Sequence, residues 1–116
     1  PRVCPDKWNT GGLRRISDSL PFGDVIRSAP TSKRERVIAA HPSLKPQAFL
    51  RQVVRAILPL EKGVVLDPFA GSGSTLAAAE AVGYQSVGVE RDPAYVQVAK
   101  SSIKALSELR IERLTG

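Results

Sequence analysis

The sequence has no methionine, only one cysteine and no long run of apolar residues among its 116 positions. Cys4 cannot form an internal disulfide and has no neighbours at metal-ligand spacing, so we expect neither a disulfide nor a metal site. The short apolar runs exclude a helix that spans a bilayer, and no signal peptide is recognisable. These absences predict a cytoplasmic protein without a membrane partner. A chain without methionine, even at position 1, is also expected to be part of a longer protein.

Acidic residues are scarce in the first half of the chain. Residues 1–60 contain 11 Lys and Arg against 4 Asp and Glu, whereas residues 61–116 contain 6 against 7. The excess positive charge therefore lies in the first half, notably in "GGLRR" and "SKRER". This asymmetry suits binding to a phosphate backbone, and it is equally compatible with a solvated basic surface loop.

Regular structure is predicted from residue 46 onward, whereas residues 1–40 are expected to be irregular apart from a strand-like piece at 24–28. Amphipathic periodicity and β-branched runs predict a helix at 46–58, a buried strand at 63–67, a helix at 74–82, a second buried strand at 85–90 and a helix at 92–114. This order predicts an α/β fold with a right-handed parallel βαβ unit from a doubly wound sheet. Because sheets usually have about 5–6 strands, we expect this sheet to be incomplete.

The turn in "VVLDPFAGSGST" (64–75) follows a strand, and ligands of such sheets bind at the carboxyl ends of strands. The turn lacks the lysine of a Walker loop, and Leu76 stands where a dinucleotide-binding loop has its third glycine. Asp67 would repel a pyrophosphate and attract a cation, while Glu90 ends the next strand, where an acid commonly binds ribose hydroxyls. A nucleoside with a cationic group and no phosphate fits, which predicts S-adenosylmethionine (SAM). The alternative is that both acids are ordinary solvent-facing strand ends.

Three ordered segments carry a resemblance to a known family. "DPFAGSGST" (67–75), "HPSLKP" (41–46) and "GYQSVGVERDPAYVQVAKSSI" (83–103) resemble the cofactor elements of the bacterial amino-group DNA methyltransferases. These enzymes methylate an exocyclic nitrogen of adenine or cytosine. The resemblance covers roughly residues 40–105 and implies a partial Rossmann-like, SAM-dependent methyltransferase fold with a parallel βαβ core and flanking helices.

The resemblance also implies roles for individual residues. Asp67 is expected to meet the methionine end of SAM, Glu90 to hold its ribose, and His41, Ser43 and Lys45 to lie near its carboxylate. The full set of expected cofactor-binding residues is His41, Ser43, Lys45, Asp67, Pro68, Phe69, Ala70, Gly71, Ser72, Gly73, Ser74, Thr75, Glu90 and Arg91. Three alternatives stay open: His41 as a turn residue bonded to backbone, Phe69 as core packing, and Asp92 as a helix cap rather than a ligand contact.

The family's catalytic element, an Asp/Asn/Ser-Pro-Pro-aromatic tetrapeptide, is missing because the sequence contains no Pro-Pro pair. We therefore assign no catalytic residue and expect the C-terminal part of an enzyme whose catalytic element precedes its SAM motif, inactive alone. Residues 1–40 would end the target-recognition region and 41–116 would form the SAM-binding region. Double-stranded DNA is the expected partner, with phosphates near Arg14, Arg15, Lys33, Arg34 and Arg36.

Two other functions stay open at this point. One is a SAM-dependent methyltransferase acting on RNA or a small molecule. The other is a non-catalytic subunit that docks to a separate catalytic chain. A homodimer is also open, because an incomplete sheet leaves an edge available for pairing.

Overall fold

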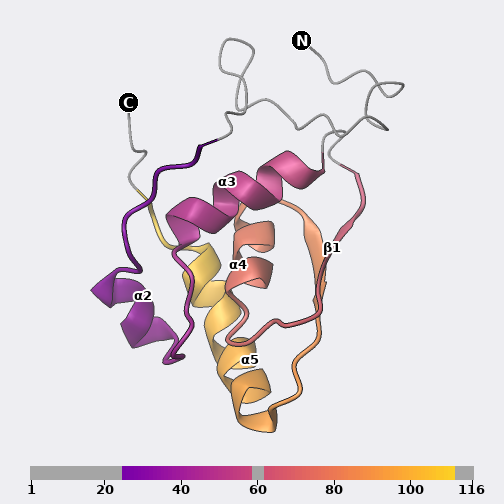
Figure 1. Ribbon diagram of the computed structural model, residues 1–116. Coiled ribbons are helices and arrows are strands. Elements are labelled where there is room, and N and C mark those ends of the chain that lie inside the picture. The colour runs from indigo at the N-terminus through magenta and orange to yellow at the C-terminus, as the bar shows by residue number, and fades with distance from the viewer. Residues whose placement is uncertain (1–24, 59–61, 112–116) are drawn as a thin grey trace, which may run out of the picture.

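The computed structural model describes residues 25–58 and 62–111. Their elements are α2 (Lys33–Ile38), α3 (Gln47–Ile57), β1 (Val64–Asp67), α4 (Ser74–Ala81), β2 (Gln85–Gly88) and α5 (Pro93–Ser107) (Figure 1). From α3 onward, this is the predicted order of helices and strands. The α/β class is therefore confirmed.

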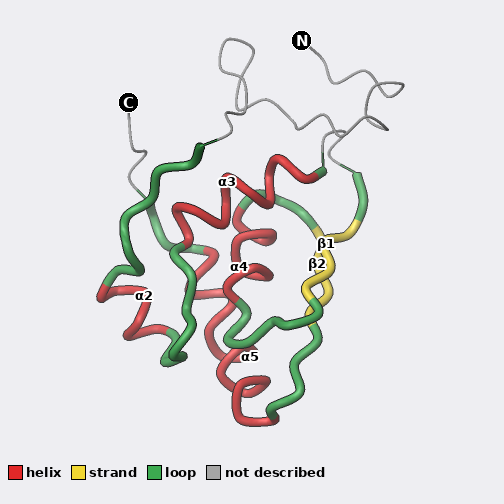
Figure 2. The backbone as a smooth tube through the Cα atoms, in the orientation of Figure 1, coloured by secondary structure: helices red, strands yellow, loops and turns green. Residues whose placement is uncertain are grey.

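The two strands form one parallel sheet, and α4 makes the connection between them (Figure 2). In the register, Leu66 lies opposite Val87 and Asp67 lies opposite Gly88. The pairing continues beyond β2, since the Val89 N–H donates to the Asp67 carbonyl at 2.9 Å. Both strands therefore end at the same edge of the sheet, next to the loop that leads into α4.

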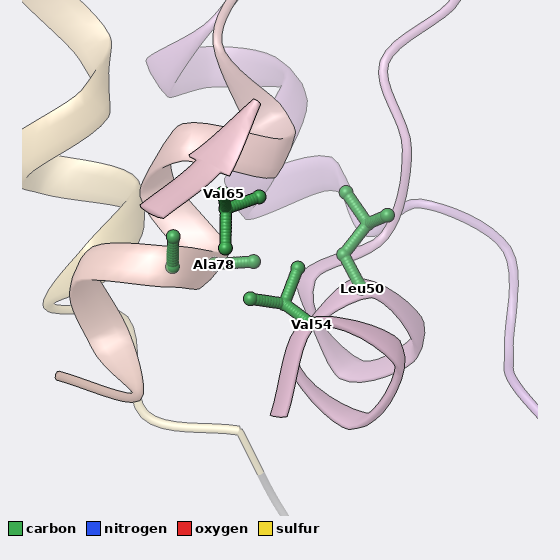
Figure 3. Close-up of a cluster of buried hydrophobic side chains, with 5 residues drawn as sticks. Leu50, Val54, Val65 and Ala78 are labelled. Atoms are coloured by element: carbon green, nitrogen blue, oxygen red, sulfur yellow. The ribbon is translucent and has the colours of Figure 1, made fainter. Parts of the chain in front are cut away.

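Helix α4 lies at the centre of the molecule, in contact with α3, α5 and both strands (Figure 1). Its residues Ala77, Ala78 and Ala79 are completely buried. Small side chains let the surrounding elements approach the helix backbone closely, as the alanine-rich sequence predicts. On the α3 side, Ala78 packs with Val65 of β1 and with Leu50 and Val54 (Figure 3).

The ends of the helices have identifiable causes. Pro46 is the N-cap of α3, and Gly83, with φ +85°, follows the end of α4. Asp92 caps α5 by accepting a bond from the Ala94 N–H, which confirms the cap alternative. Helix α5 ends at Ser107, so the predicted extension was wrong over 108–111 and lies outside the described residues over 112–114.

Helix α2 was missed, because residues 1–40 were expected to be irregular. It begins with a capping box: the Ser32 hydroxyl accepts from the Glu35 N–H, and the Glu35 carboxylate accepts from the Ser32 N–H. The Ser-x-x-Glu spacing is a recognisable helix start and was the available signal. The strand-like piece was also wrong, since 25–28 form no strand and residue 24 lies outside the described part.

The second face of the sheet is open in the described part of the chain. Val65 is buried under α3 and α4, but its neighbours Val64 and Leu66 are 51% and 64% exposed, and Val87 is 53% exposed. Because alternate side chains point to opposite faces of a strand, helices cover only one face here. The prediction of fully buried strands was therefore wrong for this face. Within the described residues, no helix is long and apolar enough to cross a membrane.

Candidate functional site

The loop between β1 and α4 is shaped by an acid and two glycines. Asp67 Oδ1 accepts the Phe69 N–H at 3.0 Å, which turns the chain at the end of β1. Gly71 and Gly73 both have positive φ, +56° and +84°, and Gly73 is the N-cap of α4. The Gly73 N–H donates to the Ala70 carbonyl at 2.8 Å, which closes the last turn of the loop. Residues 68–73 are named the glycine loop below.

Glu90 joins the end of β2 to this loop. One carboxylate oxygen accepts the Gly71 N–H at 2.9 Å, and the other accepts the Asp92 N–H at 3.1 Å. Asp67 ends the neighbouring strand, so both acids lie at the carboxyl edge of the sheet beside the glycine loop. A carboxylate has about four acceptor positions, so Glu90 keeps capacity for further donors.

His41 lies on the other side of the loop. Its Nδ1 accepts the Ser43 N–H at 3.0 Å, which is the turn role left open above. In the neutral imidazole the proton therefore sits on Nε2. A Cβ added to Gly71 would lie 3.1 Å from that Nε2, so the ring rests directly against the loop backbone. The ring also contacts Tyr95 of α5 edge-on, with centroids 4.3 Å apart.

Gly73 is needed for packing as well as for its backbone angle. A Cβ at this position would lie 2.6 Å from Ile103 Cγ1 and 3.2 Å from Ala99 Cβ, both on α5. Glycines in such a loop can let a ligand approach the backbone closely. In the structure, the space next to each glycine is taken by a side chain of the protein itself, that of His41 or of Ile103.

Among the predicted cofactor residues outside the glycine loop, His41 and Glu90 contact Gly71, and the members of the predicted set differ in exposure. Ser72, Gly73 and Ser74 are buried; His41, Asp67, Ala70, Gly71, Thr75 and Glu90 are partly exposed; Ser43, Lys45, Pro68, Phe69 and Arg91 are exposed. Phe69 is 87% exposed, so the core-packing alternative for it was wrong. Lys45 lies outside α3, as its position before a proline predicts, and forms no hydrogen bond or ion pair among the described residues.

Sequence reasoning missed a buried polar network behind the loop. Gln47 is completely buried, and its side-chain amide donates to the Ser74 carbonyl at 2.8 Å. Glu35 accepts the Gln47 N–H at 2.7 Å, and Arg51 donates to the carbonyls of Leu106 and Leu109, both at 2.8 Å. A signal was present: residues 47 and 51 lie on the helical face of Leu50 and Val54, where apolar residues are expected.

Arg51 keeps its charge in this setting. Burial lowers the pKa of its guanidinium below the usual value, and the nearby negative charge of Glu35 opposes that change. Arginine cannot be deprotonated in proteins, so a cation caps the last carbonyls of α5 over the whole working pH range. The carbonyls at the end of α5 thus have a charged partner from another helix.

The basic residues predicted to meet DNA divide into two groups. Lys33, Arg34 and Arg36 lie exposed on α2, and none of them forms an ion pair with another described residue. Arg14 and Arg15 lie outside the described part of the chain. No group of acidic, histidine or cysteine residues in the described part could hold a metal ion.

Comparison with known proteins agrees with this geometry. The model of the DNA methylase family, the N6/N4 methyltransferases, matches residues 5–101. The chain is 29% identical over 101 residues to the type II methyltransferase M2.DpnII of Streptococcus pneumoniae, covering 87% of this chain and 37% of that protein. It is 38% identical over 89 residues to M.ScaI of Streptomyces caespitosus, covering 77% and 28%. The chain thus spans about a third of the length of these relatives.

Solved structures show the same fold. The M1.HpyAVI–SAM complex superposes with a TM-score of 0.63 at 23% identity, covering 79% of this chain and 44% of that chain. The modification methylase TTHA0409 of Thermus thermophilus, complexed with SAM, gives a TM-score of 0.50 at 21% identity, covering 89% and 58%. The fold is therefore a partial Rossmann-like methyltransferase fold. With the family model matching most of its length, the chain belongs to the N6/N4 DNA methylase family.

Proposed function

We propose that this chain is the SAM-binding portion of a DNA methyltransferase that acts on an exocyclic amino group of adenine or cytosine. One observation carries the proposal: Asp67 ends β1 and Glu90 follows β2 at the same edge of the sheet, beside a glycine loop that Glu90 already holds through the Gly71 N–H. Family membership supports the reaction class, and the three motifs of the resemblance support the cofactor.

The residues fit the chemistry of SAM. The Asp67 carboxylate is partly exposed and suits the α-ammonium group. The Glu90 carboxylate has spare acceptor positions for the ribose hydroxyls, and the His41 Nε2–H is a donor available beside Gly71 for a carboxylate. When bound, SAM supplies the electrophilic methyl group. The protein residues bind and orient it.

The DNA side of the proposal involves different parts of the chain. We assign residues 41–116 to the SAM-binding region and residues 1–40 to the end of a target-recognition region. The exposed cations of α2 would meet DNA phosphates, which supply most of the sequence-independent affinity of DNA-binding proteins. The Pro-Pro-aromatic element would come from another part of the enzyme, so we expect no turnover by this chain alone.

The cofactor role is tested by calorimetric titration of the chain with SAM, comparing the wild type with Asp67→Asn. Asparagine keeps an oxygen that can accept the Phe69 N–H, so the turn is retained and only the charge is lost. We expect saturable binding by the wild type and an affinity about tenfold or more weaker for the variant, because a hydrogen bond to a charged group contributes about 1.5–3 kcal/mol.

Glu80→Gln is the matched control, since Glu80 is an exposed acid on α4 whose side chain forms no hydrogen bond or ion pair with another described residue. We expect the control to bind like the wild type. Equal binding by Asp67→Asn would leave SAM as the cofactor and place its ammonium elsewhere. A folded wild-type chain that binds no SAM would contradict the proposed function.

A further inference from the structure

Gln47 is an unusual residue for its place in the fold. It occupies the first position of α3, on the face that also carries Leu50 and Val54, and none of its surface is exposed. Burying an amide without hydrogen bonds costs about 1–3 kcal/mol. Gln47 avoids that cost, because its side-chain N–H donates to Ser74 and its oxygen accepts from Arg51 Nε at 3.3 Å.

The acceptor on Ser74 is a backbone carbonyl in the first turn of α4, immediately after the glycine loop. Three contacts from different parts of the chain hold the loop and the residue that follows it. The Gly71 N–H donates to the Glu90 carboxylate, and Ile103 packs against Gly73. The Gln47 amide donates to the Ser74 carbonyl. Of these three contacts, only that of Gln47 comes from a residue preceding the loop in sequence.

Gln47 is itself held in place from α2. Pro46, the N-cap of α3, forms no side-chain cap, and Glu35 takes the free Gln47 N–H instead. The second oxygen of Glu35 accepts from the backbone N–H and the hydroxyl of Ser32, so both oxygens of this buried carboxylate are hydrogen-bonded. Hydrogen bonds therefore hold both the backbone N–H and the side-chain amide of Gln47 in place.

We propose that Gln47 is a positioning residue for the cofactor loop: it fixes the first turn of α4, and through it the place of Gly71 and Gly73. The inference rests on the proposed SAM-binding function and adds a residue to it that touches no ligand. It acts through Ser74, at a distance from the acids that would meet SAM.

The experiment compares Gln47→Leu with Gln52→Leu in the same helix. Gln52 is half-buried, and its amide donates, among the described residues, only within α3, to the Ala48 carbonyl at 2.9 Å. Leucine fills a similar volume in both variants without forming hydrogen bonds. We expect SAM affinity to fall about tenfold for Gln47→Leu and to stay within about twofold of wild type for Gln52→Leu.

A second readout needs no ligand. Amide hydrogen exchange in the free protein is expected to speed up about tenfold at Gly71, Gly73 and Ser74 in Gln47→Leu, while the strand amide of Val87 keeps its wild-type rate. A residue with a merely structural role would lower protection throughout the fold. Faster exchange that is confined to the loop therefore distinguishes a positioning role from a general loss of stability.

Gln47→Glu supplies a third readout, and it serves where the leucine variant does not fold. A protonated carboxyl can donate to the Ser74 carbonyl and an ionised one cannot, so protection of the loop should return as the pH is lowered. The charged groups facing this position are Glu35 from α2 and Arg51 from α3. The wild type, measured at the same pH values, corrects for titration elsewhere.

The outcomes separate the two proposals. Unchanged loop exchange and unchanged SAM affinity in Gln47→Leu would overturn the positioning role. A wild-type chain that binds no SAM, together with faster loop exchange in Gln47→Leu, would contradict the proposed function and leave the positioning role standing. Loss of protection at Val87 equal to that at Gly73 would also overturn it.

Discussion

At the scale of single residues, Gly73 and Gly83 have the same backbone angle and different surroundings. Their φ values are +84° and +85°, but a Cβ at Gly73 would lie 2.6 Å from Ile103, whereas one at Gly83 would meet nothing within 4 Å. We expect Gly83→Ala to cost about 1 kcal/mol of unfolding free energy from backbone strain alone. Gly73→Ala should cost roughly 1–3 kcal/mol more, because overpacking adds to the strain.

Urea denaturation of the two alanine variants measures this difference directly. The free-energy cost of a positive φ is common to both variants. The difference between their losses of unfolding free energy therefore measures the clash of the new Cβ with α5. Equal losses would mean that α5 moves away from the loop at little cost, and that Gly73 is required only for its conformation.

The position of the candidate site follows from local sequence, because strand ends and glycine turns leave a pattern there. Asp67, the glycines and Glu90 lie together as this pattern indicates, and their binding of SAM stays a prediction. Gln47 could not be assigned its role in the same way, because its partner Ser74 is 27 positions away. A polar residue on an apolar helix face shows that a partner exists, and only the folded chain shows which one.

At the scale of elements, α2 presents a compact group of cations. Lys33, Arg34 and Arg36 are all exposed on a single short helix. We expect their joint replacement by glutamine to weaken binding to duplex DNA and to lower the steepness of its salt dependence. The slope of log affinity against log salt should fall by about 0.9 for each phosphate that the variant no longer neutralises.

The matched control replaces exposed cations on α5, at Lys100 and Lys104, by glutamine. Binding titrations at several salt concentrations should show little change for this variant. If both variants weakened binding and lowered the slope equally, α2 would not touch DNA, and the positive charge would act only through the net charge of the chain. The Ser32–Glu35 capping box is untouched, so α2 should stay folded in the test variant.

Helices and strands were predictable to different extents for physical reasons. α3, α4 and β1 were placed to within about a residue, because periodicity, a proline or glycine and β-branched runs all agree there. The length of α5 was overestimated because the helical periodicity continues past Ser107. The carbonyls of Leu106 and Leu109 bind Arg51 of another helix, a contact that local sequence does not reveal. Helix α2 was missed because its residues are mainly charged and carry no apolar periodicity, although its capping box was readable.

At the scale of the whole molecule, the open face of the sheet is the surface that most favours association with other chains. Leu66 and Val87 face each other across the two strands and are 64% and 53% exposed. Exposed apolar faces and free strand edges favour association with other chains. We expect the isolated chain to self-associate, and replacement of both residues by serine to shift it toward monomer in sedimentation velocity.

Stability supplies the control for this prediction. Val65 precedes Leu66 in β1, points to the covered face and is 4% exposed, so Val65→Ala should lower the unfolding free energy by about 2 kcal/mol. The double serine variant should lose far less in the same urea titration. Unchanged association of the serine variant would show that another surface joins the chains.

The bond between Glu90 and Gly71 has a thermodynamic consequence. Both carboxylate oxygens accept from backbone N–H groups of the chain itself, so the rotamer of Glu90 and the loop it holds are set during folding. An arriving nucleoside would then lose its own entropy on binding but would impose little ordering on this corner of the protein. Substitutions that stiffen this corner further should bring almost no gain in affinity, whereas freeing Glu90 would transfer the cost of ordering from folding to binding.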